Sequence, residues 1–206
     1  MKLTKLPLFI LISVLSLQSA ASISLNFTAI GAHDGSSTLE CWQMEAPFDV
    51  SASSGTVGEA TAKLGNVANI TYGVLPPSVP GALHNAPHNQ WVMIIRGTAR
   101  ITLPGETTYA HLVGGPYALI FAADTADVSV RGHHTEWNSM TETIFLQIPT
   151  ADGKVPPHVV LHKGPCGIKE VTGIRDLAMG MEARRTEGGL GFQNQEPVRD
   201  SRHNEL

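Results

Sequence analysis

Short apolar stretches recur along the chain between turn-forming residues. Residues 90–96 and 117–122 form continuous apolar runs, whereas residues 100–103 and 107–113 alternate apolar with polar side chains. A continuous run is typical of a strand buried on both faces, and alternation is typical of a strand with one solvated face. The chain shows no strong helical periodicity across this part. The pattern therefore predicts an all-β fold, an antiparallel sandwich or barrel.

The same reasoning places the remaining elements. A loop is expected over residues 49–58 and a short helix over residues 171–182, which Gly173 and Gly180 weaken. There is no internal repeat and no sign of a second folded domain, so one β-barrel domain is expected over residues 22–185, followed by a flexible tail over residues 186–206. Further strands are predicted at residues 23–29, 66–75, 127–130, 133–138, 143–148 and 158–162.

The first 21 residues have the pattern of a secretory signal peptide. Lys2 and Lys5 give a positive start, residues 6–17 are almost entirely apolar, and residues 19–21 are small. The apolar run is too short to cross a bilayer comfortably, so cleavage is expected to leave no stable membrane span. The alternative is an uncleaved N-terminal anchor.

Composition narrows the function classes. The 206 residues are 42% hydrophobic and only 16% charged, which suits one compact domain with a real core. The formal net charge is −4, so a basic face for nucleic acid is not expected.

Entry into the secretory pathway changes how the two cysteines are interpreted. In an oxidising lumen, Cys41 and Cys166 are expected to form a disulfide that ties the start of the mature domain to its end. The alternative is two buried thiols. Asn26 and Asn69 each begin an Asn-X-Thr sequon and are candidate glycosylation sites.

The C-terminus carries a candidate targeting signal. Residues 203–206 read His-Asn-Glu-Leu and resemble the HDEL-type retention signal, with Asn in the position of Asp. Retention in the lumen of the endoplasmic reticulum is one expectation. A polar tail on a secreted protein is the other.

Two stretches concentrate candidate chemistry. Residues 80–97 carry His84, His88 and Gln90, and residues 114–138 carry the pair His133 and His134. In a narrow barrel, neighbouring strands bring alternate side chains to the inner face, so His84, Gln90 and one histidine of the pair can converge. Successive residues of a strand point to opposite faces, and the sequence leaves open which of the pair faces inward.

Together these stretches resemble the motifs of the cupin superfamily, which are G(X)5HXH(X)3-4E(X)6G and G(X)5PXG(X)2H(X)3N. Gln90 lies seven positions before Gly97, where the first motif has its glutamate. His84 then matches the first histidine and Ala86 the second. His134 and Asn138 match the H(X)3N ending of the second motif.

The phrase HNAPHNQ, followed later by GHHT, also looks like a group of small single-domain cupins with HxAPxxQ and GHxT motifs. In that comparison the matching positions are Asp124, His133 and Thr135. The resemblance covers roughly residues 75–149. It implies a jelly-roll β-barrel.

The resemblance also implies a divalent metal, since standard cupin sites use three histidines and a glutamate. The candidate ligands are His84, Gln90, and His133 or His134, with His88 as a substitute for the missing histidine. Fe, Mn, Zn, Cu or Ni are the candidate metals, although Ala86 cannot ligate and Gln90 is neutral. The alternatives are metal-free acid/base chemistry and histidines that merely satisfy hydrogen bonds.

Without a metal, His84 and His133 are the candidate catalytic residues, because imidazole carries protons near neutral pH. Asp124 is expected to orient the His133 ring, although Asp also favours turns. An apolar wall for a ring-shaped substrate is expected from aromatic residues, for which core packing is the alternative. These residues are Trp91, Tyr117 and Trp137.

Small cupins of this kind occur among tailoring proteins of microbial and fungal metabolite pathways. The resemblance thus implies an enzyme for isomerisation, cyclisation, dehydration or an oxygenase step on a small organic substrate. A homodimer is a candidate assembly. The alternative is a non-catalytic secreted protein, germin-like, with a binding or storage role. We find no GxSxG, HExxH or phosphate-loop motif that would favour another class of enzyme.

Overall fold

The structure, a computed structural model, describes residues 23–171. The predicted signal peptide, the C-terminal tail and nearly all of the predicted helix lie outside this range. Within it the chain forms thirteen strands and no helix, so the predicted all-β class is confirmed. Accordingly, no described helix has the length and apolarity needed to span a membrane.

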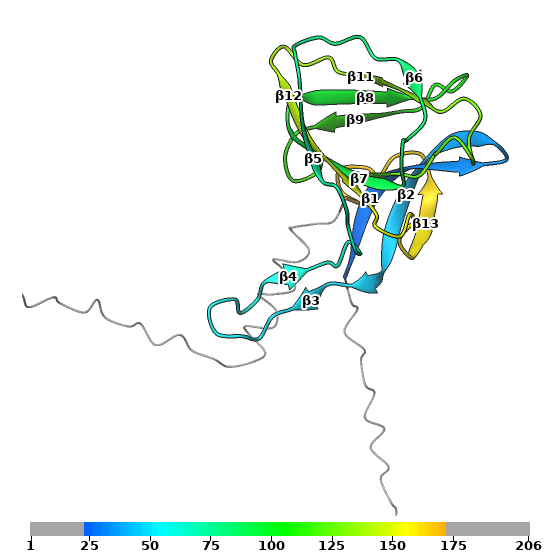
Figure 1. Ribbon diagram of the computed structural model, residues 1–206. Coiled ribbons are helices and arrows are strands. Elements are labelled where there is room, and N and C mark those ends of the chain that lie inside the picture. The colour runs from blue at the N-terminus through cyan, green and yellow to red at the C-terminus, as the bar shows by residue number, and fades with distance from the viewer. Residues whose placement is uncertain (1–22, 172–206) are drawn as a thin grey trace, which may run out of the picture.

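Two sheets make up the body of the molecule. In Figure 1 the strands of the smaller sheet lie at one end of the molecule. The smaller sheet has the order β6 (Leu83–His84), β11 (His133–Glu136), β8 (Thr98–Thr102) and β9 (Tyr109–Val113). The larger sheet has the order β13 (His158–Lys163), β2 (Ser36–Pro47), β1 (Ser24–His33), β10 (Leu119–Ala122), β7 (Gln90–Arg96), β12 (Thr143–Pro149) and β5 (Thr71–Leu75). A hairpin of β3 (Asp49–Val50) and β4 (Ala60–Thr61) projects from the opposite end (Figure 1).

Most predicted strands are present, and the departures have local causes. Residues 127–130 form no strand, because the amides of Val128 and Ser129 both donate to the carbonyl of Thr125 in a tight turn. Only the second half of the predicted strand over residues 66–75 pairs as β5.

The predicted loop over residues 49–58 begins with the two-residue strand β3, and the hydrophobic pattern also missed the equally short β4 and β6. Strand β2 is the longest element that the pattern missed. It pairs with β1 through a two-residue turn, in which Asp34 and Gly35 both have positive φ, 50° and 75°. Asp-Gly is a strong sequence signal for this type of hairpin turn. The dipeptide, rather than apolar periodicity, predicts β2.

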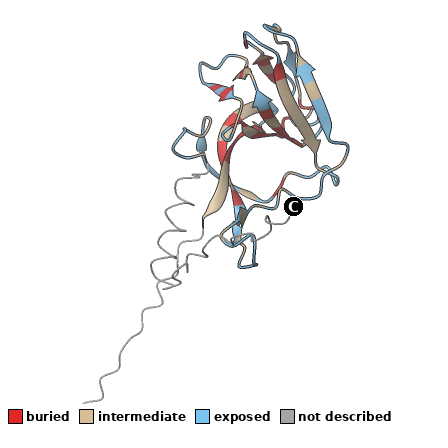
Figure 2. Cartoon of the chain, turned by 90° about the vertical axis from the view of Figure 1, so that its left-hand side faces the viewer, coloured by how far each residue is buried: buried red, intermediate tan, exposed pale blue. Residues whose placement is uncertain are grey.

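The larger sheet is covered on both faces. One face packs against the smaller sheet through a cluster that includes Ile30, Val92 and Ile101. The opposite face carries a second cluster around Phe27 and Trp91. Figure 2 shows buried residues gathered on the central strands, with the outer loops exposed. Double coverage explains why residues 90–96 lack alternation, since both sides of β7 contact apolar groups.

The predicted disulfide is present. Cys41 on β2 is bonded to Cys166, 125 positions further along the chain. The amide of Cys166 donates a hydrogen bond of 3.0 Å to the Thr28 hydroxyl on β1, so this segment is also fixed non-covalently. The C-terminal end of the edge strand β13, which pairs with β2, is thereby fixed.

Replacing Cys41 and Cys166 together by alanine should destabilise the fold. A cross-link that closes a loop of this length restricts the unfolded chain, and its loss is expected to cost about 2–5 kcal/mol. Chemical denaturation of the double variant and of the non-reduced parent measures the difference. Equal midpoints for the two proteins would show that the bond contributes nothing.

Candidate functional site

A cavity of about 330 Å³ lies between the two sheets. Apolar side chains from both sheets form most of its wall, among them Ile30 and Ile120 from the larger sheet and Leu112 from the smaller one. The polar side chains in the wall are His84, Asn85, Gln90, His133, Thr135 and Gln147. The cavity is therefore an apolar chamber with a limited set of hydrogen-bonding groups, which is typical of a small-molecule site.

Backbone pairing brings the two candidate histidines together. His84 on β6 lies opposite His133 on β11, and their ring centroids are 4.5 Å apart. Glycine makes this approach possible. Gly132 has φ +69°, and a Cβ there would lie 2.1 Å from the His84 carbonyl oxygen; at Gly81 it would lie 1.6 Å from that of Thr135.

His133 is held by a buried carboxylate. Its Nδ1 lies 2.7 Å from Oδ2 of Asp124, and the two side chains are 5% and 0% exposed. The Ser37 hydroxyl donates to the same Oδ2 at 2.7 Å. Since a carboxylate oxygen accepts, the ring must carry its proton on Nδ1, which leaves Nε2 as the nitrogen available to a ligand.

The hydrogen bonds behind Asp124 run in one direction. The Gly132 amide donates to the Ser129 hydroxyl, which lies 2.8 Å from the Ser37 hydroxyl. Ser37 uses its only proton on Asp124, so Ser129 must donate to Ser37. Such a chain polarises each successive bond and orients the carboxylate toward His133.

Asn85 joins the two stretches of the site. Its amide nitrogen donates to the carbonyls of Asp124 and Ser129, at 3.0 and 2.9 Å. The residue next to His84 thus anchors the loop that carries the carboxylate. The His84 ring is itself oriented, because its Nδ1 lies 2.8 Å from the Ala82 carbonyl and must donate to it. Both imidazoles therefore have Nδ1 occupied and Nε2 available.

One aromatic pair contributes to the wall. Trp137 stacks on Phe145 with ring centroids 5.2 Å apart, and both residues line the cavity. Gly73 on β5 lies opposite Phe145, and any Cβ there would lie 2.3 Å from the ring. A glycine within a strand often marks such a close approach, so the Gly73 position gave a usable signal for this part of the wall.

Several predicted site residues lie elsewhere. His134 points away from the cavity toward Glu136, because it alternates with His133 along β11. Trp91 is fully buried on the far face of the larger sheet, where its indole nitrogen donates to the Leu64 carbonyl. Tyr117 is 41% exposed and does not line the cavity. Of the three aromatic residues predicted to form the wall, only Trp137 does so.

The donor set in the cavity does not match the four-ligand cupin centre. His84 and His133 each have one available nitrogen, and Gln90 adds a neutral amide. Among the described residues no carboxylate and no third imidazole lines the cavity. His88, the proposed substitute, lines a separate outer cleft. Two imidazoles and an amide supply no negative charge to a divalent ion, so these residues do not fit such a centre.

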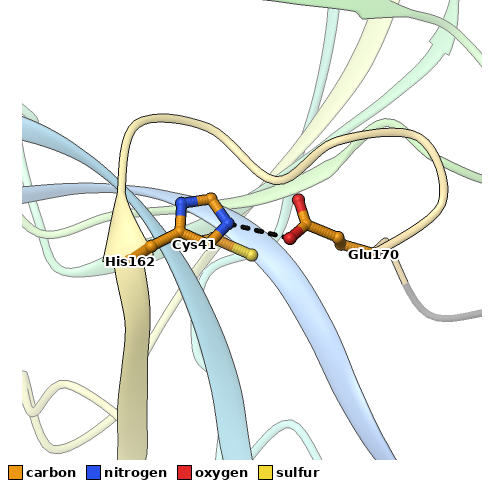
Figure 3. A group of neighbouring side chains, drawn as sticks. All are labelled: Cys41, His162 and Glu170. Atoms are coloured by element: carbon orange, nitrogen blue, oxygen red, sulfur yellow. Dashed lines mark hydrogen bonds and ion pairs between the residues drawn. The ribbon is translucent and has the colours of Figure 1, made fainter.

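A different group could hold a metal ion. Ligand atoms of Cys41, His162 and Glu170 lie within 4.8 Å of one another. Figure 3 shows these three side chains. However, the Cys41 sulfur is bonded to Cys166, and a disulfide sulfur is not the thiolate that zinc requires. The remaining two side chains pair with each other, His162 Nε2 to Glu170 Oε1 at 3.0 Å.

The two glycosylation sequons occupy different settings. Asn69 is exposed at the rim of the outer cleft and has φ 51°. Asn26 lies within β1, where its amide group is hydrogen-bonded to Gln43 and to the Glu170 carbonyl. Asn69 is therefore the more accessible acceptor in the folded chain.

Some residues of the site had no usable signal in the sequence. Ser37 lies 87 positions from Asp124, and nothing in its surroundings predicts that contact. Asn85 was within the motif that suggested the site, but its role depends on the position of the 124–129 loop. Comparisons with family models, curated proteins and solved structures gave no match.

The tautomer of His133 can be tested without a substrate. In NMR spectra its Nδ1 proton should resonate far downfield and exchange slowly, because it is buried in a charge-assisted hydrogen bond. Asp124→Asn should abolish the signal. His134→Gln is the matched control and should retain it. A signal that persists in Asp124→Asn would contradict the assignment.

The His162–Glu170 pair should make stability depend on pH. The carbonyl of Lys163, more than Glu170, raises the pKa of His162 above 6.5, and the Gly167 amide, more than His162, lowers the pKa of Glu170 below 4.5. The His162 contribution is complete below pH 6.5 and disappears as pH rises through the raised pKa. The Glu170 contribution is complete above pH 4.5 and disappears as pH falls through the lowered pKa.

His162→Ala should therefore destabilise most between about pH 4.5 and 6.5, by a small amount because both groups are partly exposed. Thermal unfolding across this range measures the effect. His33→Ala, which removes a far more exposed partner of Asp34, is the control and should show less. A loss that is the same at every pH would argue against the titration of this pair.

Proposed function

We propose that this chain is a small-molecule enzyme of the cupin type, which moves a proton within a substrate held between the two sheets. The reaction class is isomerisation, cyclisation or dehydration. One observation carries the proposal, the buried Asp124–His133 pair whose ring borders a cavity shared with His84. A histidine held by a buried carboxylate at a cavity wall is suited to proton transfer.

In the proposed mechanism His133 is the general base. Its Nε2 accepts a proton from a carbon or oxygen of the substrate, and the imidazolium that forms is stabilised by Asp124. His84 lies close enough to serve a second position of the same molecule, with ring centroids 4.5 Å apart. Because the Nδ1 proton of His84 is donated to the Ala82 carbonyl, its Nε2 accepts a hydrogen bond from a substrate hydroxyl at that position. His133 then returns its proton to the substrate, to a second carbon or oxygen in isomerisation, or to a leaving hydroxyl that departs as water in dehydration.

Several features support acid/base chemistry over the oxygenase alternative. An oxygenase step would use a redox metal, and the cavity offers two imidazoles and an amide instead of three histidines and a glutamate. In addition, Asp124 and the hydrogen-bonded serine hydroxyls behind it hold His133 in one tautomer. We therefore assign no step to a metal.

A binding or storage protein is the alternative function. Its apolar cavity would serve equally well, but binding alone gives no reason to bury a carboxylate, which is costly unless it is paired. We also propose that the protein acts in the secretory pathway. The Cys41–Cys166 disulfide is compatible with an oxidising compartment.

The test is complementation followed by metabolite profiling. A strain that lacks the gene should accumulate the substrate, and the wild-type gene should restore the product. His133→Gln and Asp124→Asn are each expected to reduce turnover by about 10²–10⁴-fold, since each removes the oriented base. His84→Gln should lower turnover by less than these two variants, since it removes a hydrogen-bond acceptor for the substrate and leaves the oriented base in place.

His134→Gln is the matched control, because this residue is adjacent to His133 but lies on the opposite face of β11. It should retain turnover. Melting temperatures of His84→Gln and His134→Gln should stay within a few degrees of the wild type, whereas His133→Gln and Asp124→Asn should melt at lower temperature because each breaks a buried pair. Turnover is therefore compared at a temperature at which all four variants are folded, so that a loss of product reflects chemistry. Full product formation by Asp124→Asn and His133→Gln would leave the binding function as the better account.

A further inference from the structure

We infer that the cavity selects an uncharged ligand with an apolar ring body and a hydroxyl or carbonyl group, and that it rejects carboxylates and phosphates. As a statement about the substrate, this rests on the proposed function. As a statement about binding, it can be measured without any turnover.

Charge is the first argument. Among the described residues that line the cavity there is no Lys, Arg, Asp or Glu. An anion that enters an apolar chamber loses its hydration, and it is stable there only if a fixed cation replaces the water. Within residues 23–171, the only ionisable side chains in the wall are His84 and His133, and His133 already donates to a carboxylate.

The carboxylate of Asp124 adds to this effect. It lies directly behind His133, and within residues 23–171 its only ion-pair partner is that ring. One of its oxygens, Oδ1, is buried without a hydrogen-bond partner among the described residues. A second anion at the cavity wall would meet this negative charge at short range and in a poorly screening environment. The wall is therefore unfavourable for anions and tolerant of neutral molecules.

The amide side chains in the wall indicate the polar group of the ligand. Gln90 is only 4% exposed, and it lines both the cavity and the outer cleft. No side-chain hydrogen bond engages it within the described part of the chain. An amide offers one acceptor and two donors, so it pairs with a hydroxyl or a carbonyl without requiring charge. Gln147 lies at the same boundary between cavity and cleft.

Size and shape complete the description. A chamber of about 330 Å³ with Trp137 stacked on Phe145 in its wall accommodates a small ring system. Flat aromatic rings pack favourably against such a pair. The probe set should therefore keep one two-ring body constant and vary only the polar group.

The experiment compares three probes by isothermal titration calorimetry at neutral pH: 2-naphthol, naphthalene and 2-naphthoate. They share a ring system and differ by a neutral hydroxyl, no polar group and an anion. We expect naphthol to bind best and naphthoate to bind at least about tenfold more weakly than naphthol. Naphthalene should fall between them. Naphthoate binding as tightly as naphthol, or no binding of naphthol at all, would overturn the inference.

Three variants locate the binding and its cause. Gln90→Leu should weaken naphthol by about three- to tenfold and leave naphthalene nearly unchanged, because only naphthol uses the amide. Gln147→Lys should raise the affinity for naphthoate relative to naphthol by adding a cation. Ala99→Phe should abolish binding of all three probes by filling the cavity that Ala99 lines.

Ala122→Leu repeats the filling test from the opposite sheet, in case the larger side chain at position 99 prevents folding. Val160→Ser, on the exposed edge strand, is the control for binding to apolar surface and should have no effect. Probe affinities that follow Val160→Ser and ignore both filling variants would contradict the inference. These binding results are separate from turnover, so either proposal can fail while the other holds.

Discussion

The close approach of β6 to β11 is the constraint on which the site depends. Two backbone segments come together so tightly that no side-chain carbon fits at Gly81 or Gly132. This contact places His84 opposite His133 in register, so the main chain determines where both side chains begin, and the ring centroids lie 4.5 Å apart. Main-chain register is a rigid constraint, and rigid placement is what a catalytic pair requires.

The polar network behind His133 depends on the same contact. Asn85 follows His84 directly and hydrogen-bonds to the loop that carries Asp124. Ser129, at the other end of that loop, accepts from the Gly132 amide. One backbone contact therefore organises both imidazoles, the carboxylate and the hydroxyl chain. The His133–Asp124 bond is buried between the apolar sheets, which strengthens it, whereas the His84 bond to the Ala82 carbonyl is exposed.

Apolar periodicity was sufficient to predict the all-β class and most of the longer strands, because burial on one or two faces leaves a direct trace in the sequence. The runs at residues 90–96 and 143–148 are good examples. Strand β2 was missed because its signal is a turn dipeptide. Trp91 shows a second limit of prediction from the sequence. Composition indicates that a large aromatic side chain is buried, but only the sheet arrangement decides which face buries it.

The site was predictable only as far as local motifs reach. His84, Gln90, Asp124 and His133 stand out by residue type and spacing. The structure places His84, Gln90 and His133 in one cavity wall, and Asp124 lies behind His133 and hydrogen-bonds to it. The choice between His133 and His134 needed the register of β11, which no local pattern fixes. Ser37 needed the tertiary fold itself.

The bond between Cys41 and Cys166 converts most of the domain into a closed covalent ring that runs through every strand from β3 to β13. Both histidines and Asp124 lie inside this ring. A protease that nicks an exposed loop, such as residues 51–59, therefore cannot separate the fragments, and the cavity keeps all of its walls. A single cut in this loop would therefore appear as two fragments only under reducing conditions, and it would release no part of the site.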